Sequence, residues 1–275
     1  MYDYGARNYD PALGRYFTID NFSEAFYNIN PYQYTANNPV KFIDVNGDYI
    51  YIYGEDGMGY RYDKGKTYSQ DKDGNWNEYT AKEGSYVAQI VGALNDITQG
   101  DENSFGSKFL DMFANDDVNV DVKQNNSTSS KTKDRNMTRG TTIYTSFNQK
   151  ESVMTTDGMQ PLPFSMILGH ELAHGLSENL FKESVTSKPW ITANSSNGLP
   201  YDISQDEIFA TMFENMIRAE KGLPLRTHYI PTSEGSVLEE SRIIKKSKAQ
   251  NPFNTQYEPT EQAVKIWNNI VNSRK

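Results

Sequence analysis

The chain of 275 residues contains no cysteine and only three histidines. The absence of cysteine excludes disulfides, thiolate zinc sites and cysteine nucleophiles, so any bound metal must be held by nitrogen and oxygen ligands. Basic residues are in the minority, and the formal net charge of −9 argues against nucleic-acid binding as the main activity. No apolar run approaches the roughly 20 residues that span a bilayer. Residues 1–4 lack the basic start of a signal peptide, so we expect secretion or delivery by a carrier.

Two of the three histidines lie four residues apart in the motif HELAH at 170–174. Apolar residues at helical spacing predict a helix over 164–180, and on a helix this spacing places His170 and His174 on one face. There they can hold a single metal ion, with Glu171 beside them as the general base that acts on water. The motif therefore predicts a metal-dependent hydrolase, with zinc (Zn²⁺) as the metal.

A catalytic zinc keeps three protein ligands and one open position, so a third ligand has to come from another element. The next predicted helix, 204–221, offers carboxylates, as in gluzincins. We prefer Glu207, because the small Ala210 three positions later lets this helix pack closely against the motif helix. Two alternatives stay open. Glu214 lies seven residues further on the same helix face, and His228 follows in a loop or strand.

A second pair of residues has side chains that can stabilise the negative charge that develops during hydrolysis. Hydrolysis of an amide builds negative charge on the attacked carbonyl oxygen, which a guanidinium or a phenol hydroxyl can stabilise. Arg226 and Tyr229 are spaced as R-x-x-Y and are candidates for this catalytic role.

The remaining pattern predicts an α+β fold with three parts. Residues 1–47 form a β-rich stub, residues 48–82 a β-hairpin linker region, and residues 83–275 a zincin-like domain with a small sheet, the HExxH helix and the third-ligand helix. In the last part we expect helices over 84–97, 105–113, 164–180, 204–221 and 260–272. We expect strands over 118–122 and 141–147. Polar composition predicts a loop over 123–139 and an irregular connecting segment over 186–200.

The N-terminal segment resembles the end of the RHS/YD-repeat core. The resemblance is carried by YDYGARNYDPALGRY at 2–16, NPYQY at 30–34 and NNP at 37–39. It implies that the chain is the C-terminal toxin cassette of an RHS carrier, with a stub of that carrier and a cognate immunity protein. The junction departs from the family's Asp-Pro-x-Gly pattern of self-cleavage, because residues 44–48 are DVNGD.

Residues 161–229 resemble the NleD-like effector zinc metallopeptidases. The resemblance is carried by HELAH at 170–174, by Glu207, by ENMIRAEKGLPLR at 214–226 and by Tyr229. It implies a secreted endopeptidase that cuts a protein substrate in a target cell. Two other hypotheses remain: a non-catalytic structural or interaction fragment of an RHS surface protein, and a zinc amide hydrolase of a small substrate.

Overall fold

The computed structural model divides the chain into two compact units, Met1–Gly47 and Asp48–Lys275. In the first unit the structure describes three short antiparallel strands, β1 (Tyr2–Asp3), β2 (Asn8–Asp10) and β3 (Arg15–Tyr16). The other segments of the predicted RHS stub, at 30–34, 37–39 and 44–48, lie outside the described residues. In the second unit the described residues are 50–113, 118, 120–125, 131–136, 140–148, 150–194, 198–230, 237–247 and 256–274.

The described part of the second unit contains a seven-stranded sheet in the order β7-β6-β5-β4-β8-β10-β9. The strands β4, β8 and β10 run parallel, and the other neighbours are antiparallel. Their bounds are β4 (Ile50–Tyr53), β5 (Gly59–Asp63), β6 (Lys66–Gln70), β7 (Trp76–Tyr79), β8 (Val120–Gln124), β9 (Lys131–Asn136) and β10 (Gly140–Thr145). Alternate residues of β4 and β5 are buried, as the period of two in a strand requires, whereas the first three residues of β8 are all buried.

This sheet corrects two of our predictions. The region 48–82 is not a separate linker, because β4 pairs with β8 and brings its hairpins into the central sheet. The segment 123–139 is not a continuous loop, because β9 forms within it and pairs with β10. Backbone hydrogen bonds to a neighbouring strand hold such a polar segment, and polar composition alone does not reveal them.

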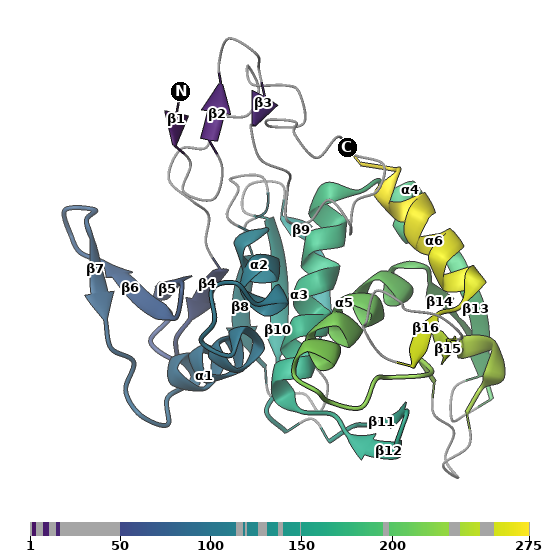
Figure 1. Ribbon diagram of the computed structural model, residues 1–275. Helices are drawn as coiled ribbons and strands as arrows, with labels where there is room; N and C mark the ends of the chain where they lie inside the picture. Colours follow the sequence, from purple (N-terminus) through teal and green to yellow (C-terminus); the bar gives the residue numbers. More distant parts are fainter. Residues whose placement is uncertain are drawn as a thin grey trace. The chain divides into compact units, whose positions relative to one another are not determined.

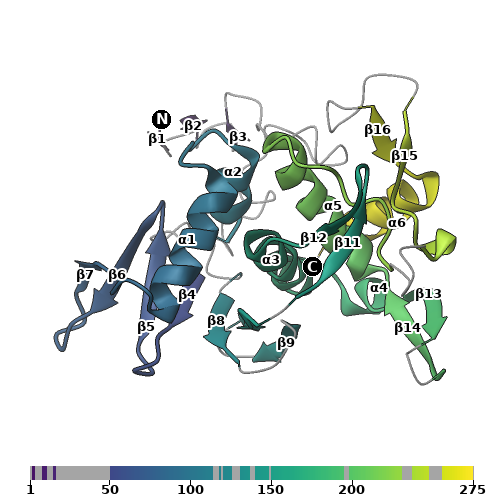
Figure 2. The same cartoon turned by 90° about the horizontal axis from the view of Figure 1, so that it is seen from below.

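Five of the six described helices follow the predicted positions closely, and the short α4 was not predicted. Their bounds are α1 (Tyr86–Thr98), α2 (Phe105–Asp111), α3 (Phe164–Leu180), α4 (Glu183–Thr186), α5 (Asp206–Glu220) and α6 (Glu261–Val271). Helix α3, which carries the HELAH motif, lies between the sheet and α5 (Figure 1, Figure 2). The predicted α+β class is confirmed.

Two glycines set how closely α3 approaches its neighbours. A Cβ at Gly175 would lie 3.3 Å from Val120 of the sheet, and a Cβ at Gly169 would lie 3.1 Å from Ile217 of α5. Both distances are at the limit of normal contact, so a larger side chain would push the elements apart. Gly169 therefore lets α5 pack closely against α3, and Gly175 lets α3 pack closely against the sheet.

Short hairpins surround this helix pair. They are β11 (Ser152–Thr155) with β12 (Gly158–Pro161), β13 (Pro189–Asn194) with β14 (Pro200–Ser204), and β15 (Ile244–Lys246) with β16 (Tyr257–Pro259). A 3₁₀ turn covers Glu239–Ser241. The polar connecting segment predicted over 186–200 thus contains β13 and the start of β14. Among the helices that the structure describes, none combines the length and the apolar character needed to cross a bilayer.

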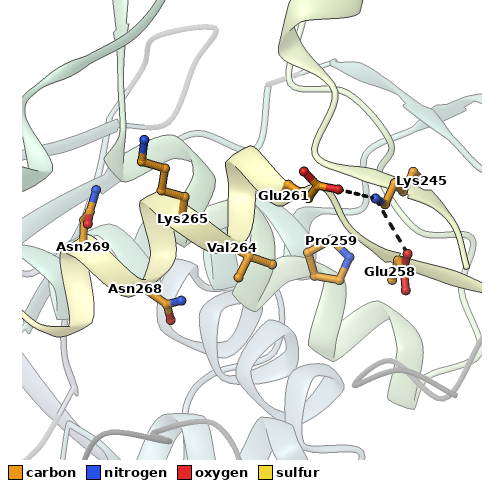
Figure 3. A pocket seen from close by; sticks show the side chains of 8 residues that line it. All are labelled: Lys245, Glu258, Pro259, Glu261, Val264, Lys265, Asn268 and Asn269. Carbon is orange, nitrogen blue, oxygen red and sulfur yellow. Dashed lines mark ion pairs between the residues drawn. The ribbon is translucent and has the colours of Figure 1, made fainter. Parts of the chain in front are cut away.

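A shallow pocket lies between the β15–β16 hairpin and α6 (Figure 3). Lys245 Nζ at its rim lies 3.9 Å from Glu258 Oε1 and 3.6 Å from Glu261 Oε1. Glu261 is exposed and the other two side chains are partly exposed, so solvent screens their attraction and the pairs add little stability. The residues that line this pocket include neither histidine of the HELAH motif.

Candidate metal centre

Three side-chain atoms from α3 and α5 converge on one point. His170 Nε2 lies 3.2 Å from His174 Nε2, and each of these atoms lies 3.1 Å from Glu207 Oε2. With zinc bonds of about 2.0–2.1 Å, tetrahedral geometry places ligand atoms about 3.3 Å apart. Among the described residues, these three form a group that could hold a metal ion. The donor set and its spacing therefore fit zinc.

The fold explains why these atoms meet. His170 and His174 lie one turn apart on α3 and are both nearly buried, with 8% and 9% of their surface exposed. Glu207 lies in the first turn of α5, which packs along α3. Its side chain keeps 21% of its surface exposed, so the cluster opens to solvent on the side of Glu207.

Asp206 fixes the orientation of His174. Its Oδ2 lies 2.5 Å from His174 Nδ1, the ring nitrogen that faces away from the cluster, and its Oδ1 accepts a hydrogen bond from Ser177 Oγ. A carboxylate in this position fixes the tautomer that leaves Nε2 free for a metal. The position of Asp206 at the start of α5 does not by itself indicate this contact. The adjacent pair Asp206-Glu207 was the available signal.

Glu214, the carboxylate alternative for the third ligand, lies behind His170 instead. Its Oε2 is 3.3 Å from His170 Nδ1, on the side of the ring that faces away from the ligand cluster. Glu214 is completely buried and pairs with two arginines, accepting from Arg218 Nε at 2.8 Å and from Arg226 Nη1 at 3.0 Å. Burial raises the pKa of Glu214, but the charge of Arg226 and the contact with His170 hold it below its usual value.

His228, the other alternative, is not part of the ligand cluster. Its Nε2 lies 3.3 Å from Glu239 Oε2, and its Nδ1 lies 2.9 Å from Thr227 Oγ1. The backbone of His228 forms an isolated β-bridge with Arg242. This pairing turns the imidazole toward the 3₁₀ turn, which sequence spacing could not reveal.

The guanidinium of Arg226 lies over the ring of Tyr229, 4.9 Å from its centroid. The guanidinium donates to Glu214, to the carbonyl of Tyr229 at 2.9 Å and to the carbonyl of His228 at 3.3 Å. All three guanidinium nitrogens are engaged with the protein, and the residue is only 7% exposed. Arg226 therefore supports the chain that carries Tyr229, and its contribution to catalysis stays a prediction.

Tyr229 lies beside the ligand cluster. Its ring is 6.4 Å from the ring of His170 and nearly parallel to it. Burial and the negative charge of Glu207 raise the pKa of Tyr229 well above its usual value, and a hydrogen bond to Glu207 adds to this. The phenol therefore stays protonated at neutral pH and remains a hydrogen-bond donor.

Glu171 is partly exposed, although its neighbours on α3 are buried. Its charge also contributes to the raised pKa of Tyr229, which indicates that the carboxylate lies near the phenol. Glu171 and Tyr229 thus lie near each other beside the ligand cluster.

The ligand residues attract one another electrostatically. Burial lowers the pKa of His174, but the charges of Glu207 and Asp206 raise it well above its usual value. Burial raises the pKa of Glu207, but His174 and His170 hold it well below its usual value. A metal that binds here displaces protons from the histidines, so its affinity increases with pH.

Replacing Asp206 by asparagine is expected to weaken zinc binding by about 10–100-fold, because the neutral amide holds His174 less firmly. Competition with a fluorescent zinc chelator at fixed pH measures this affinity. Asp202→Asn is the matched control, since the exposed Asp202 accepts a hydrogen bond from Thr192 on the neighbouring strand. Equal affinity of the Asp206→Asn variant and the wild type would show that Asp206 does not orient the ligand.

Comparison with known proteins identifies a family. The family model of peptidase M91, described as an effector protein, matches residues 77–229, which is more than half of the chain. The matched segment includes the ligand cluster, Asp206, Glu214 and Tyr229. No curated protein and no solved structure matches the chain.

Proposed function

Because the chain belongs to the peptidase M91 family of effector proteins, we propose that it is a zinc-dependent endopeptidase that cleaves a protein of the cell into which it is delivered. The observation that carries this proposal is the convergence of His170, His174 and Glu207 beside Glu171. A peptidase with this ligand set and a glutamate after the first histidine has the parts of a gluzincin active site. The arrangement of α3 and α5 against the sheet supports a zincin-like fold.

Zinc bound to these residues would lower the pKa of water to about 7 and polarise the scissile carbonyl. The chain supplies the remaining chemistry. Glu171 takes the proton of the attacking water and passes it to the leaving amine. The protonated hydroxyl of Tyr229 donates a hydrogen bond to the carbonyl oxygen as negative charge develops there. Asp206 and Glu214 lie next to the Nδ1 atoms of His174 and His170, which face away from the cluster, and hold the two histidines in place.

The proposed peptidase also needs a carrier that delivers it and a protein that neutralises it in the producing cell. The resemblance of residues 2–16, 30–34 and 37–39 to the end of an RHS/YD-repeat core supports an RHS carrier and its secretion apparatus. A toxin carried in this way requires a cognate immunity protein in the producing cell. The family match begins at residue 77 and does not bear on this segment.

The test compares metal-free protein with zinc-reloaded protein in lysates of bacterial and of eukaryotic cells. Proteomic identification of new protein termini is the measurement. We expect a small set of new termini in one lysate with zinc-reloaded protein only, and none after reloading with magnesium. An unchanged set of termini in both lysates would contradict the endopeptidase proposal.

A further inference from the structure

The hairpin of β13 and β14 is joined directly to the helix that carries Glu207. The backbone N–H of Gln205, the residue before α5, donates to the carbonyl of Lys188 at 2.8 Å. This bond closes the base of the hairpin against the first turn of α5. The base of the hairpin therefore has a fixed position beside the ligand cluster.

A β-bulge at this base directs Trp190 toward the active-site tyrosine. The pairing register shifts between Pro189 and Ile191, so Trp190 is the extra residue of β13. Bulges re-aim side chains and are common beside active sites. The indole ring lies 6.3 Å from the ring of Tyr229, in an edge-to-face arrangement. Because Tyr229 stacks on His170, the rings of Trp190, Tyr229 and His170 form a continuous wall beside the ligand cluster.

Two buried polar atoms at this place have no hydrogen-bond partner among the described residues. The first is Trp190 Nε1, on a side chain that is 9% exposed, and the second is Gln205 Oε1. Buried donors and acceptors are nearly always satisfied, because leaving them unpaired costs free energy. One of these atoms is a donor and the other an acceptor. Gln205 pairs across the hairpin with Lys188, two residues from Trp190.

An extended polypeptide offers carbonyl oxygens and N–H groups in alternation along its backbone. We propose that Trp190 donates its indole N–H to a backbone carbonyl of the bound substrate, and that Gln205 Oε1 accepts from a substrate N–H. These bonds hold the polypeptide beside Tyr229, with the scissile bond over the ligand cluster. This inference rests on the proposed peptidase function. It makes the base of the β13–β14 hairpin a subsite that recognises peptide backbone rather than a particular side chain.

The test uses zinc-loaded full chain and hydroxamates, which bind catalytic zinc. Acetohydroxamate reaches the metal only. Acetyl-trialanyl hydroxamate and a succinyl hydroxamate coupled to dialanine add peptide backbone on either side of the metal. For wild type, we expect at least one peptidyl hydroxamate to bind more tightly than acetohydroxamate in isothermal titration. Trp190→Phe is expected to lower the affinity for that peptidyl hydroxamate roughly tenfold, which is the scale of one hydrogen bond. The affinity for acetohydroxamate is expected to stay unchanged.

Two further variants make the test specific. Gln205→Leu removes the acceptor at similar volume and is expected to give the same pattern, and it replaces Trp190→Phe if that variant fails to fold. Trp76→Phe on β7 is the matched control and is expected to bind all probes as the wild type does.

Three results would overturn the inference. In the first, the peptidyl hydroxamates bind wild type no more tightly than acetohydroxamate. In the second, both variants keep full affinity for them. In the third, the variants lose affinity for acetohydroxamate as well, which would show that Trp190 and Gln205 act on the metal site and not on the substrate. Failure of acetohydroxamate to bind wild type would instead contradict the zinc site and the proposed function.

Discussion

Glu171→Gln is expected to lower the rate of peptide cleavage by about 10²–10⁴-fold, because glutamine cannot accept the proton of the attacking water. The substitution keeps the size of the side chain and leaves the three ligand residues in place. Zinc content and thermal stability are therefore expected to stay at wild-type values. The measurement is the rate at which new protein termini appear in the sensitive lysate, at equal protein and zinc concentrations.

Glu178→Gln is the matched control for this prediction. Glu178 lies two turns further on the same partly exposed face of α3 and contacts Thr141 of the sheet at 3.1 Å. It is outside the ligand cluster, so we expect activity close to that of the wild type. Full activity of Glu171→Gln would remove Glu171 from the mechanism. Loss of zinc in that variant would show that Glu171 supports the metal site rather than the proton transfer.

Glu214→Gln is expected to lower the free energy of unfolding by about 3–5 kcal/mol, because it leaves two buried arginines without their counter-charge. Glu214 is completely buried, and both Arg218 and Arg226 pair with it. Chemical denaturation of metal-free protein is the measurement, since bound zinc would add its own stabilisation. We also expect weaker zinc binding after reloading, because His170 Nδ1 loses its carboxylate neighbour.

Glu261→Gln controls for the loss of one negative charge. Its side chain is 95% exposed and lies 3.6 Å from Lys245, so the free energy of unfolding is expected to change by less than about 1 kcal/mol. A double variant, Glu214→Gln with Arg226→Met, is expected to recover part of the loss, because it removes one of the two uncompensated charges. A loss of under about 1 kcal/mol for Glu214→Gln alone would show that the buried arginines find other partners.

The sequence was sufficient to predict the helix of the metal site. Apolar spacing predicted residues 164–180, which are the bounds of α3. The i, i+4 spacing of His170 and His174 then determined that both rings share a face. Local rules are enough here, because the histidines depend on one helix only.

The choice among the carboxylates of α5 could not be made by spacing alone. Glu207 and Glu214 share a helix face, and which of them reaches the ligand cluster depends on how α5 packs against α3. The close contact of Gly169 with Ile217 contributes to that packing, and it joins residues far apart in the sequence. The roles of Asp206 and Glu214 behind the histidines follow from the same packing.

The sequence also failed where long-range contacts decide the direction of a side chain. Arg226 and Tyr229 have the spacing for a joint catalytic role, but the contacts of the guanidinium with the buried Glu214 and with two backbone carbonyls depend on the fold and not on this spacing. Trp190 lay in a segment whose polar composition predicted no regular structure. A bulge in a hairpin brought it to Tyr229.

Zinc content tests the central claim most directly. Purified full chain and the Glu207→Ala variant are loaded with zinc, dialysed against metal-free buffer and analysed by elemental mass spectrometry. We expect about one zinc ion per chain in wild type and a large loss in Glu207→Ala, because only two ligands of the cluster remain. No retained zinc in wild type, or equal zinc in both proteins, would contradict a zinc site built from His170, His174 and Glu207.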